Sequence, residues 1–136
     1  MLAADTIVRS DDGGPPVLGK PVDAEDARAM LRRLSGRTHA VVTAYHLQYK
    51  GVERGRAVET AVTFRELTPA ELEGYIGSRE WEGKAGAYAI QGLAGAFVRT
   101  VKGSYTNVVG LPLCEVLEDL DTLGALPPDW ALGQKR

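Results

Sequence analysis

The sequence predicts an α/β or α+β fold built on a mixed sheet, and three observations indicate this class. Runs that alternate between apolar and polar residues, typical of half-buried strands, occur in both halves of the chain. Between and after them stand runs with apolar residues at helical spacing. The 136 residues, 44% of them hydrophobic and 25% charged, are enough for one domain with its own core.

The N-terminal elements are a strand, a turn-rich segment and a helix. Residues 2–8 form an apolar run that carries one carboxylate, Asp5, and they predict a short buried strand. Glycines and prolines over 9–21 indicate turns. Asp23 is placed to cap a helix that runs to about Leu34.

The middle of the chain predicts a hairpin followed by a short helix. Two alternating runs rich in Val, Thr and Tyr cover residues 38–49 and 56–64, and residues 50–54 connect them. Thr68 then begins a capping box with proline at the first helical position. The helix that it starts is expected to end at about Ile76.

The last third of the chain predicts a second hairpin and a final helix. Residues 96–101 and 104–109 are the two expected strands of that hairpin. Pro112 then opens an amphipathic helix, which Gly124 ends. The predicted organisation is one domain over residues 1–124 and a loose tail over residues 125–136.

Composition and charge exclude several functional classes. The net charge of −2, from 16 basic and 18 acidic residues, gives no electrostatic case for a nucleic-acid partner. No apolar run approaches the roughly 18 residues that span a bilayer, which argues against a membrane partner. The single cysteine, Cys114, excludes a disulfide framework, suits a reducing cytoplasm, and lies where an amphipathic helix predicts a buried structural thiol. We therefore expect a cytoplasmic domain that acts on a small molecule.

Two histidines and a tryptophan are weighed mainly as structural residues. His39 and His46 stand an odd number of residues apart in one predicted strand, so they face opposite sides and cannot share a metal. A structural role is the favoured interpretation for both. For Trp81 the sequence leaves two interpretations open, stacking on a base and anchoring a loop.

One constellation is consistent with phosphate chemistry. Asp5 lies in an apolar strand, Lys20 lies between Gly and Pro, Lys84 precedes a run of small residues over 85–87, and Gln91 precedes a glycine. Hydrolysis of a polyphosphate needs cations that hold it and a carboxylate that holds a metal or activates water. A glutamine amide is able to read a base edge. The alternative is a strand-end cap for Asp5 and solvated surface positions for the lysines.

Several motifs in order resemble the Maf family of nucleoside triphosphate pyrophosphatases, from Leu2 to about Leu120. This family has the inosine-triphosphatase-like α/β fold. The motifs are A-D-T at residues 4–6, G-K-P at 19–21, S-G at 35–36 with His39, K-A-G-A-Y-A-I-Q-G at 84–92, G-S-Y at 103–105 and N-V-V-G-L-P at 107–112.

The resemblance implies hydrolysis of a nucleoside triphosphate to the monophosphate and pyrophosphate, with a divalent cation, Mg²⁺ or Mn²⁺. By the family pattern, Asp5 is the proton acceptor and a metal ligand, and Lys20 and Lys84 contact phosphate. Thr6 and Gln91 mark the branch that prefers dTTP and UTP, as distinct from the sister branch that acts on 7-methyl-GTP. The resemblance also makes a homodimer one candidate assembly.

The sequence departs from the family pattern at its beginning. Members of the family start with a strand and a Ser-rich segment that ends in S-P-R-R, followed by a helix and a further acidic residue before the A-D-T strand. Nothing equivalent precedes Ala4 here, so we expect an N-terminally incomplete domain with an exposed sheet edge or core face. Two interpretations follow: an internal codon assigned as the start of a full-length enzyme, which the retained site residues favour, or a non-catalytic binding or regulatory module.

Overall fold

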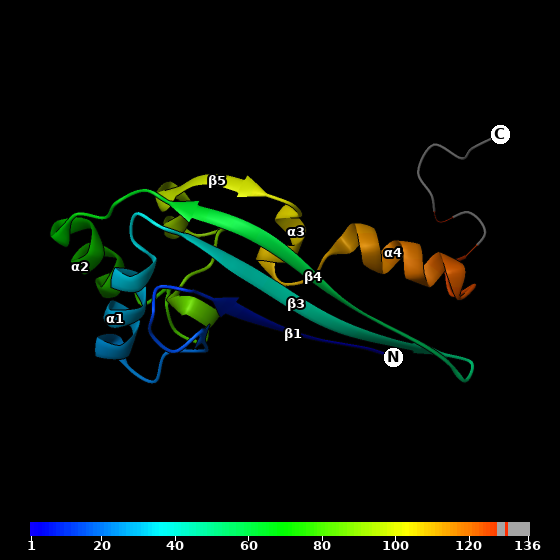
Figure 1. Cartoon of the computed structure of the whole chain (residues 1–136). Coiled ribbons are helices and arrows are strands. Elements are labelled where there is room, and N and C mark those ends of the chain that lie inside the picture. Colours follow the sequence, from blue (N-terminus) through cyan, green and yellow to red (C-terminus); the bar gives the residue numbers. More distant parts are fainter. Residues whose placement is uncertain (128–129, 131–136) are drawn as a thin grey trace.

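The structure is a computed structural model that describes residues 1–127 and Trp130. Its centre is a five-stranded sheet with the order β2-β1-β3-β4-β5 (Figure 1). The strands are β1 (Leu2–Arg9), β2 (Val17–Leu18), β3 (Thr38–Tyr49), β4 (Val52–Phe64) and β5 (Val98–Lys102). The α/β class is therefore confirmed. Each of these pairings is antiparallel, so the described sheet differs from the mixed sheet expected from the sequence.

Helices lie at both ends of the sheet (Figure 1). They are α1 (Ala24–Leu34), α2 (Pro69–Ser78), α3 (Tyr105–Val109) and α4 (Leu113–Thr122), with short 3₁₀ turns η1 (Ala85–Ala87) and η2 (Leu93–Phe97). The predicted caps are confirmed, since Asp23 accepts a hydrogen bond from the backbone of Asp26 and Thr68 forms a complete capping box. Residues 128–129 and 131–136 of the predicted tail lie outside the described residues, and the division after Gly124 stays a prediction.

The long β3–β4 hairpin is tighter than the sequence predicted. Tyr49 pairs with Val52 across a two-residue turn, and Lys50 and Gly51 both have positive φ, at 51° and 81°. This turn matches the twist of the paired strands. Pairing therefore continues through residues assigned to the connection, and β4 begins at Val52 instead of residue 56.

The prediction of a second hairpin is wrong. The strand β5 is followed by the helix α3, where the sequence predicted a strand over residues 104–109. The Ser104 side chain caps this short helix by accepting a hydrogen bond from the Asn107 backbone at 3.1 Å. Asn107 is fully buried, and its Nδ2 donates to the carbonyl oxygens of Val41 and Val58. These bonds fasten α3 to β3 and β4. An alternating pattern of apolar residues does not reveal such a polar anchor.

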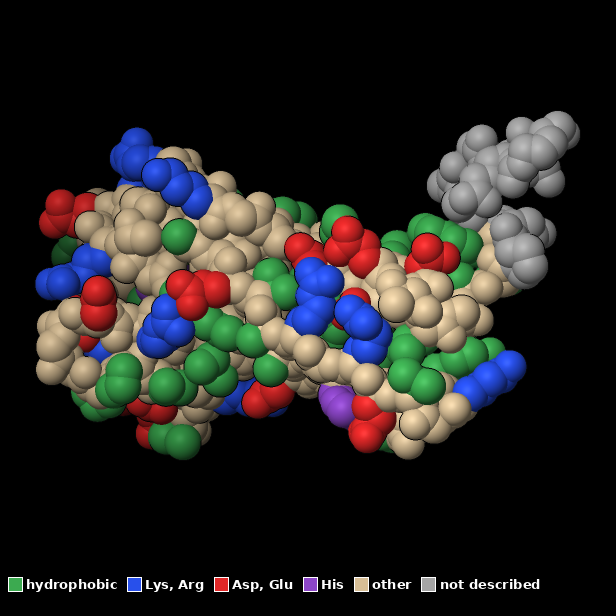
Figure 2. Space-filling model, turned by 45° about the vertical axis from the view of Figure 1, so that its right-hand side comes forward, with side chains coloured by type: hydrophobic (Ala, Val, Ile, Leu, Met, Phe, Trp, Pro, Cys, Tyr) green, Lys and Arg blue, Asp and Glu red, His purple; other side chains and the backbone are tan. Residues whose placement is uncertain are grey.

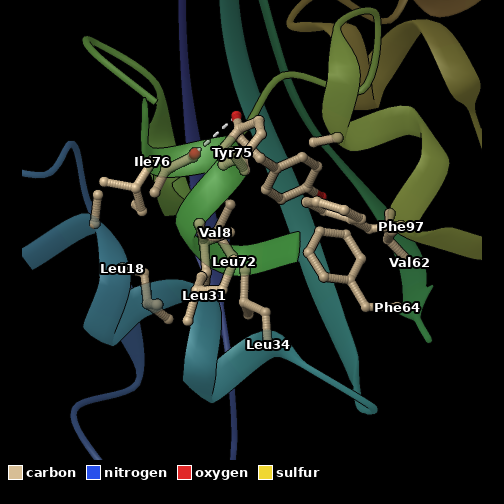
Figure 3. Close-up of a cluster of buried hydrophobic side chains, with 14 of the residues drawn as sticks. Val8, Leu18, Leu31, Leu34, Val62, Phe64, Leu72, Tyr75, Ile76 and Phe97 are labelled. Carbon is tan, nitrogen blue, oxygen red and sulfur yellow. Dashed lines mark hydrogen bonds between the residues drawn. The ribbon is translucent and has the colours of Figure 1, made fainter. Parts of the chain in front are cut away.

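The core occupies one face of the sheet in two clusters. The larger cluster packs α1, α2 and the segment 85–97 against the ends of β1, β3 and β4, with Val8, Leu31 and Phe64 among its members (Figure 3). The smaller cluster packs α4 against Tyr45 and Leu47 of β3. Every second residue of β3 from His39 to Leu47 is buried, so these side chains all lie on the face of the sheet that the core covers.

The strand β1 is less buried than the sequence predicted. Of its residues only Val8 is buried, and Leu2 to Asp5 are exposed. Because β2 pairs only with Val8 and Arg9, the edge of β1 over residues 2–7 has no partner strand within the described part of the chain. The exposed sheet edge expected from the family pattern is therefore present, and it lies beside Asp5.

A buried carboxylate attaches α4 to the long hairpin. Asp119, 1% exposed, accepts hydrogen bonds from the Tyr45 hydroxyl at 2.6 Å and from Arg54 Nε at 3.0 Å. These bonds satisfy charge that burial would otherwise penalise. Cys114 lies on the other side of the same helix and is exposed, so the predicted buried thiol is wrong. At helical spacing Cys114 lies on the side of α4 that faces away from the buried Val116 and Asp119.

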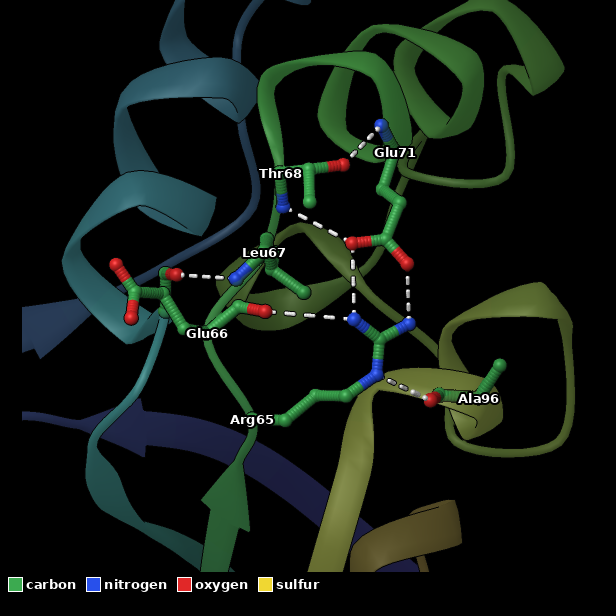
Figure 4. Close-up of polar contacts among 7 residues, drawn as sticks. Arg65, Glu66, Leu67, Thr68, Glu71 and Ala96 are labelled. Atoms are coloured by element: carbon green, nitrogen blue, oxygen red, sulfur yellow. Dashed lines mark hydrogen bonds and ion pairs between the residues drawn. The ribbon is translucent and has the colours of Figure 1, made fainter.

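Arg65 fixes the start of α2 against its neighbours (Figure 4). Its Nη1 donates to Glu71 at 2.8 Å and its Nε donates to the Ala96 carbonyl at 3.1 Å, while Glu71 also accepts from the Thr68 backbone. The Arg65 guanidinium, together with the Thr68 backbone, lowers the pKa of Glu71 to about 2. The Glu71 carboxylate therefore stays ionised near neutral pH and keeps its hydrogen bonds to Arg65 and Thr68 at the start of α2.

The molecular surface has no dominant sign of charge in the view of Figure 2. Lys and Arg side chains alternate there with Asp and Glu side chains. Within residues 1–127 and 130, every helix is too short or too polar to cross a membrane.

The two histidines face opposite sides, as predicted. His46 is exposed and bonds Glu53, whereas His39 is 3% exposed and its Nε2 lies 2.6 Å from the Tyr88 hydroxyl. Burial lowers the pKa of the His39 imidazole to about 4. His39 is therefore neutral in the folded protein over the range in which a free histidine titrates.

This pKa predicts a pH dependence of stability. The unfolded chain binds a proton at His39 below about pH 6.5, and the folded chain does so only near pH 4. The free energy of unfolding should therefore fall by about 3 kcal/mol as the pH drops through this window. Urea unfolding at several pH values measures it. A His39→Gln variant with the same pH dependence as the unaltered chain would contradict the assignment.

Candidate functional site

All five site residues predicted from the sequence line one cavity of about 390 Å³. Asp5 and Thr6 come from β1, Lys20 from the loop after β2, and Lys84 and Gln91 from the chain after α2. The fold thus brings three separate segments together, as the phosphate-chemistry interpretation requires. The chemical roles of the five residues stay predictions.

The two lysine-bearing loops are joined by a backbone hydrogen bond. Gly86 N donates to the Gly19 carbonyl at 3.0 Å, one residue before Lys20 and two after Lys84. Gly86 also lies directly on β1, where an added Cβ would stand 2.7 Å from Val8 Cγ2, and its φ is 69°. Only glycine satisfies both the close approach and the left-handed backbone. The small-residue run therefore brings Lys84 toward β1 and Lys20.

Two buried tyrosines support the loop after Lys84 from below. The Tyr75 hydroxyl donates to the Ala87 carbonyl at 3.0 Å (Figure 3), and the Tyr88 hydroxyl lies against His39. Burial raises the pKa of Tyr75 to about 12 and also raises that of Tyr88, so both hydroxyls keep their protons. Trp81 Nε1 donates to the Ile76 carbonyl at 2.9 Å, which confirms the loop-anchor interpretation of that residue.

Thr6 is held by residues that sequence reasoning missed. Its hydroxyl lies 2.8 Å from that of Thr43, which is fully buried, and 3.4 Å from the Gly110 carbonyl. Asn107 anchors α3, the helix that directly precedes Gly110. The backbone carbonyl of Asn107 also accepts a hydrogen bond from the Thr43 hydroxyl at 3.3 Å. The helix-cap spacing of Ser104 and Asn107 is the one sequence signal that points to this support.

Strand alternation determines how Asp5 approaches the cavity. β1 and β3 pair in continuous register, with Asp5 opposite Ala44 and Thr6 opposite Thr43. Successive side chains leave a strand on opposite faces, so the Cβ of Asp5 starts on the face away from Thr6. Asp5 is exposed and lies on the unpaired stretch of β1. Asp5 therefore lines the cavity at the unpaired edge of β1, while its side chain starts on the opposite face of the sheet from that of Thr6.

The charged groups of this cavity favour an anion. Lys20 and Lys84 line it against the single carboxylate of Asp5, which gives the lining a charge of +1. Within residues 1–127 and 130, no group of three or more His, Cys, Asp or Glu residues is arranged to hold a metal ion. A cation bound here would take one carboxylate from the described chain and its remaining oxygen ligands from substrate and water.

A second hollow of about 370 Å³ adjoins the first. Lys84 and Gln91 line both, and the second is otherwise bordered by Arg79, Glu80 and Glu82 together with glycine and alanine backbone. The two hollows form one recess with a cationic end at Lys20.

These features define a small α/β domain with a recess lined by two lysines, and comparison with known proteins shows its family. The family model for Maf-like proteins matches residues 1–123. A dTTP/UTP pyrophosphatase of Syntrophotalea carbinolica is 52% identical over 128 residues, covering 93% of this chain and 57% of that protein. One of Rhodopseudomonas palustris is 50% identical over 118 residues (86% and 56%), and one of Pyrococcus abyssi is 46% identical over 127 residues (93% and 66%).

The chain belongs to the Maf family, and the resemblance inferred from its motifs is confirmed. It spans somewhat more than half the length of the first two of these relatives. The part matched by the family model contains both lysine loops, β1 and the whole of the recess.

The close approach of Gly86 predicts a specific loss of stability. Gly86→Ala places a methyl group against Val8 in addition to straining the backbone, so the free energy of unfolding should fall by about 2–4 kcal/mol. Gly83→Ala is the matched control, because Gly83 has φ 71° but no heavy atom within 4 Å of an added Cβ. That variant should lose only about 1 kcal/mol. Equal losses in urea unfolding would show that contact with Val8 does not matter.

Proposed function

We propose that this chain carries the site of a nucleoside triphosphate pyrophosphatase that hydrolyses dTTP and UTP to the monophosphate and pyrophosphate. The observation that carries the proposal is the convergence of Asp5, Lys20 and Lys84 on one cavity. Relatives about half identical to this chain bear the name dTTP/UTP pyrophosphatase, which supports the same substrates here. A role in the housekeeping of nucleotide pools follows from that activity.

The geometry supports a division of roles among these residues. Lys20 and Lys84, brought together by the Gly19–Gly86 hydrogen bond, neutralise the triphosphate. Asp5 at the rim accepts the proton of the water that attacks the α-phosphorus. Pyrophosphate then leaves from the side held by the lysines. Each charged phosphate contact contributes about 1.5–3 kcal/mol.

A divalent cation, Mg²⁺ or Mn²⁺, fits this set of groups as a companion of the substrate. Magnesium in nucleotide sites is commonly held by one or two carboxylates together with substrate phosphates and water. Asp5 is the carboxylate that would hold it, and the cation would supply further neutralisation of phosphate charge. The exposed position of Asp5 leaves room for those additional ligands.

Thr6 and Gln91 are the residues proposed to distinguish pyrimidine nucleotides from 7-methyl-GTP, the alternative substrate. Gln91 is exposed where the two hollows meet, and its amide can both donate to and accept from a base edge. Thr6 is fixed by the Thr43 hydroxyl. A cytoplasmic location and a homodimer remain predictions from composition and family.

Replacement of the proposed proton acceptor tests the function. Asp5→Asn should lower the rate of pyrophosphate release from dTTP by about 10²–10⁴, because an amide does not accept the proton. The assay uses dTTP, UTP and 7-methyl-GTP with Mg²⁺, on this chain and on a version extended at its N-terminus. Asp11→Asn is the matched control, since Asp11 is an exposed carboxylate outside the recess.

Two outcomes would contradict the proposal. If Asp5→Asn hydrolyses dTTP as fast as the unaltered protein, Asp5 is not the proton acceptor. If neither version releases pyrophosphate from any of the three nucleotides, the enzymatic function falls and a binding or regulatory module replaces it.

A further inference from the structure

The turn that carries Gln91 is short and exposed, yet its backbone is closely determined. Gly92 N donates to the Ala89 carbonyl and Gly95 N donates to the Gly92 carbonyl, each at 3.0 Å. Gly95 also lies against the chain, because an added Cβ would stand 2.7 Å from the Ile90 carbonyl oxygen. These contacts hold the backbone of residues 89–95, the segment that contains Gln91.

One side chain from outside the turn enters it. Glu80, two residues after α2 ends at Ser78, accepts a hydrogen bond from Leu93 N through Oε1 at 2.9 Å. Its own backbone N donates to Ser78 Oγ at 3.2 Å, which fixes where the side chain starts. Glu80 is half-buried, whereas its neighbours Arg79 and Glu82 are exposed and pair with each other.

Gly92 is shaped to receive this carboxylate. An added Cβ at Gly92 would stand 2.1 Å from Glu80 Oε1, which is not a possible separation. The φ of Gly92 is −97°, a value open to any residue, so a side chain here would require the end of the Glu80 side chain to move away from Leu93 N. Glu80 Oε1 thus accepts a hydrogen bond from Leu93 N and occupies the space beside Gly92. These two residues directly follow Gln91 in the chain.

We propose that Glu80 is a positioning residue for Gln91. Its carboxylate fixes the turn at Gly92 and Leu93 and thereby holds the Gln91 amide where the two hollows meet, facing the nucleotide. The inference rests on the proposed function for its ligand, a pyrimidine nucleoside triphosphate. Glu80 itself acts on the substrate through Gln91, so its loss affects binding and base discrimination more than the chemical step.

The test compares Glu80→Ala with Glu80→Gln. The alanine variant removes the acceptor for Leu93 N, and the glutamine variant keeps an acceptor oxygen without the charge. Glu80→Ala should weaken dTTP binding and raise KM by about tenfold with kcat within about threefold, and Glu80→Gln should restore most of the affinity. Glu25→Ala, which removes an exposed carboxylate of α1 outside both hollows, is the matched control.

A second readout does not depend on nucleotide. Hydrogen exchange of the Leu93 amide should be faster in Glu80→Ala than in the unaltered chain, while the Leu31 amide in α1 keeps its protection and Tm changes little. Normal dTTP affinity in Glu80→Ala, or equal losses of affinity in the alanine and glutamine variants, would overturn the positioning role. If the unaltered chain binds no dTTP, the proposed function fails, and unchanged Leu93 exchange in Glu80→Ala would then overturn this inference separately.

Discussion

The contact of Gly86 with Val8 is the constraint on which the site depends. It brings the loop after α2 onto the Val8 side chain of β1, because Gly86 has no side chain of its own, and the Gly86 N to Gly19 carbonyl bond brings in the loop after β2 at the same point. Charge repulsion between Lys20 and Lys84 opposes this arrangement. The Gly86–Val8 contact and the Gly86 N to Gly19 carbonyl bond hold the two loops together, and a polyanion would gain from the charge of their lysines.

The core and the recess share their supporting residues. Tyr75 and Tyr88 belong to the larger buried cluster, and their hydroxyls hold the carbonyl of Ala87 and the ring of His39 directly beneath the loop that carries Lys84 and Gln91. Asn107 anchors α3, which precedes Gly110, to β3 and accepts a hydrogen bond from Thr43. Loss of one of these buried hydrogen bonds is therefore expected to alter the recess and to lower the stability of the fold.

Local signals in the sequence predicted the parts that local chemistry determines. The caps at Asp23 and Thr68 and the start of β3 are set by neighbours within a few residues, and they agree with the structure. The predictions that failed concern segments whose structure depends on contacts with residues far away in the sequence. Residues 104–109 alternate like a strand, but Asn107 finds three acceptors on β3 and β4 and a helix forms instead. The exposure of β1 and of Cys114 depends on which faces other elements cover, which no short pattern contains.

The candidate site was likewise predictable from the sequence only in part. Its five predicted residues stand in motifs, so their identity was available from the sequence, and their convergence on one cavity required the fold. Glu80 and Thr43 were missed because each acts through hydrogen bonds to residues distant in the sequence, Glu80 to Leu93 and Thr43 to Thr6 and Asn107. The place of Asp5 on an unpaired strand edge was missed as well, since it follows from which strands pair with β1.

The central claim is that the recess between the two lysine loops and β1 is where a nucleoside triphosphate binds. Titration of the isotope-labelled chain with dTTP and Mg²⁺, followed by NMR of the backbone amides, tests it most directly. The account predicts that the largest shifts occur at Lys20, Lys84, Gly86 and Gln91. Shifts concentrated instead around Arg9 and Glu59, which border a separate hollow of about 230 Å³, would contradict it.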